Sequence, residues 1–91
     1  MYIASKSIIS PCDFLSKHVS HIVGNLPVAK SSFYIATLDR QIKADSMLGL
    51  LSANIKKNDT ICLQVANNNS QEQADTDLQE FMKIVGDING Q

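Results

Sequence analysis

An α+β fold, with helices covering one face of a sheet, is predicted by two features of the 91-residue sequence. The predicted strands alternate apolar and polar residues, so that one face of each is buried and the other meets water. The predicted helices each carry a single apolar stripe. In chain order the elements are strand, helix, strand, strand, short helix, strand and helix. This order and patterning describe a two-layer open-faced sandwich.

The first strand is expected over residues 1–9, although its alternation does not decide whether Lys6 points toward the core or away from it. A helix follows, for which Ser16 is the expected N-cap and Asp13 the competing one. Pro27 disfavours helical geometry in the residue before it, so the helix should end near that point. The apolar stripe of this helix consists of Leu15, Val19, Ile22 and Leu26.

Residues 31–38 form the clearest strand, with Phe33 and Ile35 on one face and Tyr34 on the other. A turn and a short strand at 41–43 complete a hairpin. The next helix is short and runs from Ser46 to about residue 53. The last strand is expected at 60–66, and it places three apolar residues on one face: Ile61, Leu63 and Val65.

The final helix opens with Ser70-x-x-Gln73, the pattern of a capping box. It is expected to end at Gly86 or Gly90. Its apolar stripe consists of Ala74, Leu78, Phe81 and Val85. Its acidic residues are expected on the solvated face: Glu72, Asp75, Asp77 and Glu80.

Composition excludes several classes of protein. The chain has 8 Lys plus Arg against 9 Asp plus Glu, and this balance argues against a nucleic-acid binder. No apolar run approaches the ~20 residues of a membrane span. Two scattered cysteines form neither a disulfide framework nor a zinc pattern, which favours the cytoplasm. We expect a single domain over residues 1–91, with no cofactor, and as either a monomer or a weak dimer.

One stretch, Ala44-Asp45-Ser46-Met47-Leu48-Gly49-Leu50-Leu51-Ser52, organises the chain. Ser46 can cap the short helix by accepting a backbone N–H of its first turn. The same helix start suits an anion, so a phosphoryl group on Ser46 would meet a favourable environment. From the spacing alone, a purely capping role is the favoured explanation of the serine, because capping serines are common.

Ser-Met-Leu-Gly-Leu-Leu-Ser resembles the regulatory-serine segment of HPr, the small phosphocarrier of the bacterial sugar phosphotransferase system. The resemblance runs without gaps from about Ile8 to Val85. It implies a four-stranded antiparallel sheet with three helices on one side. It also implies a left-handed backbone at Asn54 and Asn58, where the family usually has glycine and where asparagine is the next most tolerant residue.

HPr-like proteins carry a phosphoryl group on the histidine of a motif that reads Gly-x-His-x-Arg-Pro. In this chain Leu15 takes the place of the histidine, Lys17 that of the arginine and His18 that of the proline. An isobutyl group cannot accept phosphate, so the resemblance implies that the ordinary phosphocarrier reaction is lost. His18 is expected as a solvated residue of the helix surface. A phosphoacceptor role for it is the less favoured alternative.

His21 could pair with His18 around a metal, but two ligands without a third make a weak site, and no metal is expected. Cys12, near the helix entrance, could be a reactive thiolate. We expect instead an ordinary, partly buried cysteine.

The absence of the histidine together with the presence of Ser46 resembles the catabolite-repression branch of the family. There the serine is phosphorylated by a dedicated kinase, and the phosphorylated protein binds a transcription regulator. The resemblance thus implies a serine kinase and a protein regulator as partners. The surface expected to meet them consists of Leu15, Lys17, Met47, Leu48 and Leu51.

Asp45 departs from the family, which often has lysine there, and it places a carboxylate beside the candidate phosphoserine. Two further functions stay open at this point. One is a phosphocarrier that uses a non-standard histidine, His18. The other is an interaction domain that works without phosphorylation.

Overall fold

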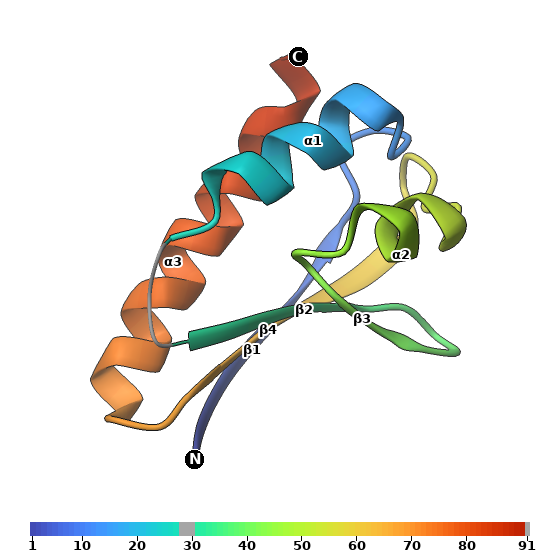
Figure 1. The fold of residues 1–91 in the computed structure, drawn as a ribbon. Helices are drawn as coiled ribbons and strands as arrows, with labels where there is room; N and C mark the ends of the chain where they lie inside the picture. Colours follow the sequence, from blue (N-terminus) through green and yellow to red (C-terminus); the bar gives the residue numbers. More distant parts are fainter. Residues whose placement is uncertain (28–30, 91) are drawn as a thin grey trace.

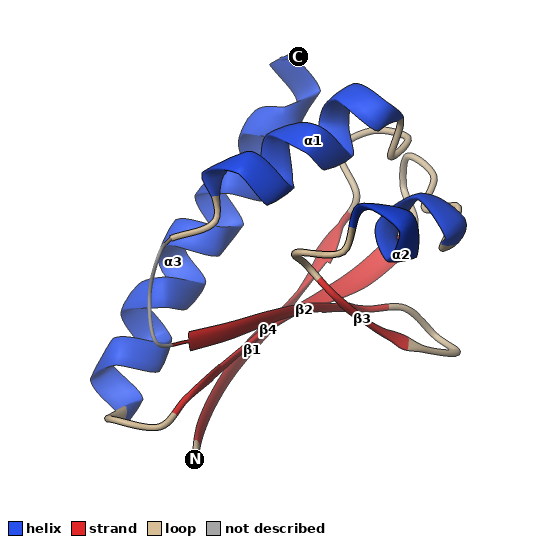
Figure 2. Ribbon diagram, viewed as in Figure 1, coloured by secondary structure: helices blue, strands red, loops and turns tan. Residues whose placement is uncertain are grey.

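A computed structural model describes residues 1–27 and 31–90 of the chain, and Figures 1 and 2 show it as a ribbon. The four strands form one antiparallel sheet in the order β1-β4-β2-β3. All three helices lie on the same side of it (Figure 2), which confirms the predicted fold class. The elements are β1 (Tyr2–Ile9), α1 (Ser16–Asn25), β2 (Ser31–Ala36), β3 (Gln41–Lys43), α2 (Met47–Ser52), β4 (Thr60–Asn67), α3 (Gln71–Asp87) and a 3₁₀ turn (Ile88–Gly90).

The register of the sheet separates its two faces as the alternation predicts. Ile35 of β2 lies opposite Leu63 of β4, and both are fully buried under the helices. In β1 the register decides what the sequence left open: Lys6 lies opposite Leu63, so it occupies the helix-covered face. Because β1 is an edge strand, the Lys6 side chain still reaches solvent.

The core lies between the sheet and the apolar stripes of the helices. Phe33 of β2 meets Phe81 of α3 edge to face, with ring centroids 5.3 Å apart. The stripe predicted for α3 is confirmed, since all four of its residues are buried. No helix within residues 1–27 and 31–90 has the length and apolar composition needed to cross a membrane.

One acidic residue of α3 is not solvated as predicted. The Asp77 side chain is 4% exposed and accepts hydrogen bonds from Ser31 Oγ at 2.5 Å and from Gln73 Nε2 at 2.9 Å. Asn67, also buried, donates from Nδ2 to the same Ser31 hydroxyl. These bonds tie the start of β2 and the end of β4 to α3, and they satisfy polar groups that would otherwise be costly to bury.

The same network explains why the predicted capping box of α3 is only half formed. Ser70 Oγ accepts the N–H of Gln73, as expected. The Gln73 side chain, however, turns to Asp77 instead of the Ser70 N–H, which donates to Asn67 Oδ1 at 3.1 Å. A buried carboxylate therefore competes successfully for the glutamine amide. The helix ends at Asp87, just beyond Gly86.

The connection between β2 and β3 is longer than predicted and spans residues 37–40. The strand β2 ends at Ala36 instead of Leu38, because the turn closes with a hydrogen bond from the Thr37 N–H to the Arg40 carbonyl at 2.8 Å. The Thr37 hydroxyl also donates to Asp39 Oδ1 at 2.9 Å. The backbone bond between Thr37 and Arg40 closes the turn, so the strand pairing does not extend beyond Ala36.

Two loops dock against each other next to the start of α1. The Phe14 N–H donates to the Ile55 carbonyl at 2.9 Å, and the Lys57 N–H donates to Asp13 Oδ1 at 2.8 Å. The second loop can take this path because Asn54 and Asn58 adopt φ values of 55° and 76°. The predicted left-handed backbone at these two asparagines is confirmed.

The left-handed conformation makes a prediction at the exposed Asn58. Asn58→Ala should lower the free energy of unfolding by about 1 kcal/mol, because a Cβ without a compensating polar group is disfavoured there. Asn58→Gly should leave stability unchanged or raise it. Urea unfolding followed by circular dichroism measures both. Lys57→Ala, one residue earlier, serves as the control and should change stability by less than about 0.5 kcal/mol.

Candidate functional site

Ser46 caps α2, as the sequence predicts. Its Oγ accepts the backbone N–H of Gly49 at 3.1 Å, and its carbonyl accepts the N–H of Leu50 at 3.0 Å. The backbone of Ser46 is extended, which is the usual conformation of an N-cap residue. The residue as a whole is half-buried.

The apolar residues after Ser46 divide between core and surface. Leu50 is fully buried, whereas Leu48 is 83% exposed and Met47 is 39% exposed. Leu51 is half-buried and packs against the core from outside. The α2 helix therefore presents apolar side chains to solvent, as predicted.

The start of α1 contributes a further exposed apolar side chain on the same side of the molecule. Leu15 is 52% exposed, and Lys17 beside it is also exposed. The helices α1 and α2 contact each other, as Figure 1 shows. We call the set Leu15, Lys17, Met47, Leu48 and Leu51 the helix-side patch.

The cap of α1 differs from the predicted one. Leu15 is the N-cap, and Ser16, expected there, is the first helical residue. Asp13, the other candidate, is engaged elsewhere by the Lys57 N–H. Leucine has no side-chain acceptor, so the first-turn N–H groups of α1 receive no cap of the usual kind. The spacing predicted Leu15 as part of the apolar stripe of α1, and this prediction is wrong, because Leu15 precedes the helix and is exposed.

His18 is buried, not solvated as predicted. Its side chain is 6% exposed, and its Nδ1 accepts the backbone N–H of Leu15 at 3.2 Å. The imidazole thus folds back over the helix start, in the way that the third helical residue does in a capping box. A ring held in this way is not presented to an incoming phosphoryl donor, so the geometry disfavours the His18 phosphocarrier.

The remaining candidates for chemistry are ordinary. His21 contacts Asn25, whose Nδ2 lies 3.4 Å from the imidazole Nδ1 and also donates to the His21 carbonyl. In the part of the chain that the structure describes, no three His, Cys, Asp or Glu side chains gather closely enough to hold a metal. Burial raises the pKa of the Cys12 thiol above its ordinary value. The Asp13 carboxylate raises this pKa further, against the opposing effect of Lys17 and Lys57.

Two residues that the sequence analysis did not single out hold α2 in place. A Cβ on Gly49 would lie 2.9 Å from Ile42 Cγ2 and 2.9 Å from Ser46 Oγ, so only glycine allows α2 to approach β3 this closely. The Arg40 guanidinium donates from Nη2 to the Ser52 carbonyl at 2.7 Å, which satisfies the C-terminal end of α2. The sequence did offer a signal for Gly49, because glycine is unusual inside a six-residue helix. It offered no signal for Arg40.

Comparison with solved structures identifies the fold. The histidine-containing phosphocarrier protein of Mycoplasma superposes with a TM-score of 0.80 at 19% identity, over 94% of this chain and 96% of its own. HPr-C-His of Thermoanaerobacter tengcongensis gives 0.73 at 12% identity, over 100% and 98%. The phosphocarrier protein HPr of Bacillus anthracis gives 0.67 at 14% identity, over 86% and 95%. No family model and no curated protein matches the sequence.

At these identities the likeness concerns the fold alone. The chain has the HPr-like fold, a four-stranded antiparallel sheet with helices on one face, over nearly its whole length. The sheet and helix arrangement that the sequence resemblance implied is therefore confirmed.

The close approach at Gly49 makes a second prediction. Gly49→Ala should destabilise the protein by about 1–3 kcal/mol, because the new methyl group meets Ile42 and the capping hydroxyl of Ser46. Gly86→Ala in α3 is a matched control, since a Cβ there has no neighbour within 4 Å. The control should gain up to about 1 kcal/mol from helix propensity alone. Chemical denaturation of the two variants beside the wild type measures the difference, and equal effects would contradict the steric explanation.

Cys12 is predicted to react slowly. In a Cys62→Ser variant, iodoacetamide should alkylate Cys12 with a pH midpoint above that of a cysteine in an unstructured peptide, because burial disfavours the thiolate. Mass spectrometry over a range of pH measures the rate. A midpoint below that of the peptide would indicate an activated thiol and would restore Cys12 as a candidate for chemistry.

Proposed function

We propose that this protein is a regulatory interaction module of the HPr-like type, without phosphocarrier activity. It binds a protein regulator through the helix-side patch, and phosphorylation of Ser46 by a serine kinase controls the binding. The single observation that carries the proposal is the exposed apolar surface of the two contacting helices α1 and α2, which includes Leu15 at the start of α1 and the residues that follow the capping serine of α2. Leu15 in place of the histidine, together with Ser46, resembles the catabolite-repression branch of the HPr family.

Loss of the phosphocarrier reaction is supported by the chemistry of α1. The N-cap position of the first helix holds Leu15, which has no nitrogen to accept a phosphoryl group. The nearest imidazole, His18, uses Nδ1 as a structural acceptor and is buried. What remains exposed at the helix start is hydrocarbon, and hydrocarbon at a surface favours binding to a partner over chemistry.

Control through Ser46 is supported by the position of its hydroxyl. The Oγ holds a single N–H of the first turn of α2, and phosphoryl oxygens can take over that bond while adding charge at the edge of the helix-side patch. The exposed Asp45 carboxylate next to it opposes the added charge, at a cost of roughly 0.5–1 kcal/mol in solvent. Such a cost is small enough for a kinase reaction to proceed.

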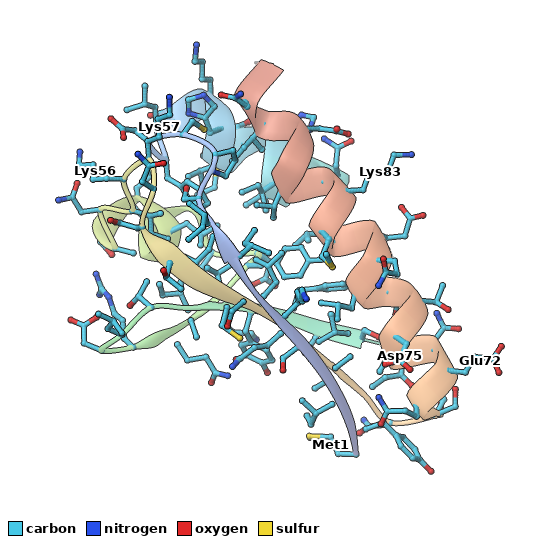
Figure 3. All side chains as sticks on the ribbon, turned by 180° about the vertical axis from the view of Figure 1, so that it is seen from behind. Met1, Lys56, Lys57, Glu72, Asp75 and Lys83 are labelled. Atoms are coloured by element: carbon cyan, nitrogen blue, oxygen red, sulfur yellow. The ribbon has the colours of Figure 1, made fainter. Side chains whose placement is uncertain are left out.

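Charge also differs between the two ends of the molecule. Figure 3 shows Lys56 and Lys57 at the end where the docked loops lie, whereas Glu72 and Asp75 lie at the opposite end on α3. Lys17 lies near Lys57, because both act on the Cys12 thiol. The carboxylates of Asp13 and Asp59 lie in the same loops, so this end of the molecule carries charges of both signs.

Phosphorylation provides the first test. Incubation with an HPr-type serine kinase and ATP should add one phosphoryl group to the wild type and none to Ser46→Ala, as measured by intact-mass spectrometry. Ser52→Ala is the control, because Ser52 Oγ donates to the Gly49 carbonyl at the other end of the same helix. No phosphate on the wild type, or equal labelling of Ser46→Ala, would remove the proposed control.

Ser46→Ala also removes the cap, so its stability must be measured separately. The substitution should lower the free energy of unfolding by about 1 kcal/mol, which leaves the fold intact for the labelling assay. A circular dichroism spectrum identical to that of the wild type confirms that the variant is folded.

Binding provides the second test. Leu48→Asp should weaken binding of the phosphorylated protein to the regulator by at least about tenfold, since it places a carboxylate in the middle of the apolar contact. Leu38→Asp is the control, because Leu38 is fully exposed at the tip of the β2–β3 hairpin and does not belong to the helix-side patch. Isothermal titration calorimetry measures both affinities. Equal losses in the two variants would contradict a role for the helix-side patch.

A further inference from the structure

The face of the sheet that the helices leave uncovered has almost no charge. The register assigns to this open face the odd-numbered residues of β1 from Ile3 to Ile9 and the even-numbered residues of β4 from Thr60 to Ala66. It adds the even-numbered residues of β2, together with Gln41 and Lys43 of β3. Among these strand residues, all within the described part of the chain, Lys43 alone is charged. A surface designed only to meet water is given about 25–35% charged residues, and this face has far fewer.

The polar side chains at the centre of the open face are bonded to one another. Gln41 Nε2 donates to Gln64 Oε1 at 2.6 Å across the intervening strand β2. Gln64 Nε2 in turn contacts Cys62 Sγ at 3.9 Å. Other polar groups of the face have no hydrogen bond to a described side chain, namely the hydroxyls of Ser5, Ser7, Ser32, Tyr34 and Thr60. A hydroxyl both donates and accepts, so a covering surface has to supply partners for these groups, and an identical face carries hydroxyls that can do so.

Exposed apolar side chains line the β1 side of the same face. Ile3 is 54% exposed and Ile9 is 58% exposed, at the two ends of the strand. A shallow hollow of about 340 Å³ lies beside Ile3, and its walls include Tyr34 and Gln64. Figure 3 shows Met1 at the end of β1, and this residue also lines the hollow. The face thus combines projecting apolar groups with a recess that can receive one.

We propose that the open face binds the open face of a second copy of this chain, forming a weak, two-fold symmetric dimer. An uncharged face has nothing to offer a charged partner, whereas an identical face meets it without leaving an unpaired charge at the centre. Lys43 lies on the edge strand β3, where it stays hydrated at the rim. The net charge of −1 per chain causes little long-range repulsion between two copies.

The size of the face sets the expected strength of the contact. Strands ~4.8 Å apart with a rise of ~3.3 Å per residue give four strands of this length a flat area of roughly 400–500 Å². Stable interfaces bury about 800 Å² per partner, so this contact falls in the weak, reversible class. The surface is separate from the helix-side patch, and the proposed regulatory function does not depend on it.

Sedimentation equilibrium at protein concentrations up to about 1 mM tests the dimer, because a weak contact is populated only there. The wild type should follow a monomer–dimer equilibrium. Ser7→Lys puts a new cation on the open face of each copy, opposite Cys62, and should raise the dissociation constant at least about tenfold. Ser20→Lys makes the same change at an exposed position of α1 and should leave the constant unchanged.

A dilution series of amide NMR spectra of the wild type gives a readout that requires no variant. Shifts should change with concentration in β1, β2 and β4 and stay constant in α1 and α2. A chain that remains monomeric at about 1 mM overturns the proposal. Association that Ser7→Lys leaves unaffected, or shifts that map to α1 and α2, also overturns it.

Discussion

The docking of residues 10–14 against residues 54–59 is the interaction on which the arrangement of the functional surface depends. Phe14 and Ile55 are both buried, and the Phe14 N–H to Ile55 carbonyl bond joins the two loops. Besides the Lys57 N–H to Asp13 bond, the N–H of Ser10 donates to the carbonyl of Asp59 at 2.8 Å. Each such bond contributes only about 0.5–1.5 kcal/mol, but together they fix where α1 begins relative to α2.

This docking has a direct effect on the helix-side patch. The loop at 10–14 leads into Leu15, and the loop at 54–59 follows α2, so the bonds between them bring the two apolar surfaces to one side of the molecule. Asp13 is drawn away from α1 by the Lys57 N–H, which leaves the helix without an acidic cap. The exposed leucine at the helix start and the inward-turned His18 are therefore two results of the same local competition for hydrogen bonds.

The sequence predicted the architecture well because it is encoded in local patterns. Alternation in residues 31–36 and 60–67 and the stripe of α3 depend on burial, which strongly selects residue type. Ser46 and the two left-handed asparagines were predictable because each has a local chemical requirement. The wrong predictions concern side chains whose hydrogen-bond partners lie far away in the sequence. Asp77, for example, is buried with a hydrogen bond from Ser31, which is forty-six residues away. Likewise, the cap of α1 is decided by a bond to Lys57 that no local pattern reveals.

The lysine in the middle of the outermost strand has a consequence for the behaviour of the protein in solution. Lys6 lies on the helix-covered face of β1 but at its open edge, where the ammonium group remains hydrated. A strand from another molecule added to this edge would strip water from that ammonium group without offering it a counter-ion. The β1 edge of the sheet is thereby protected against lateral addition of strands from other chains, which is the route to fibrils. With this edge protected, copies of the chain can associate through a surface that forms a closed two-fold dimer, such as the proposed contact between open faces.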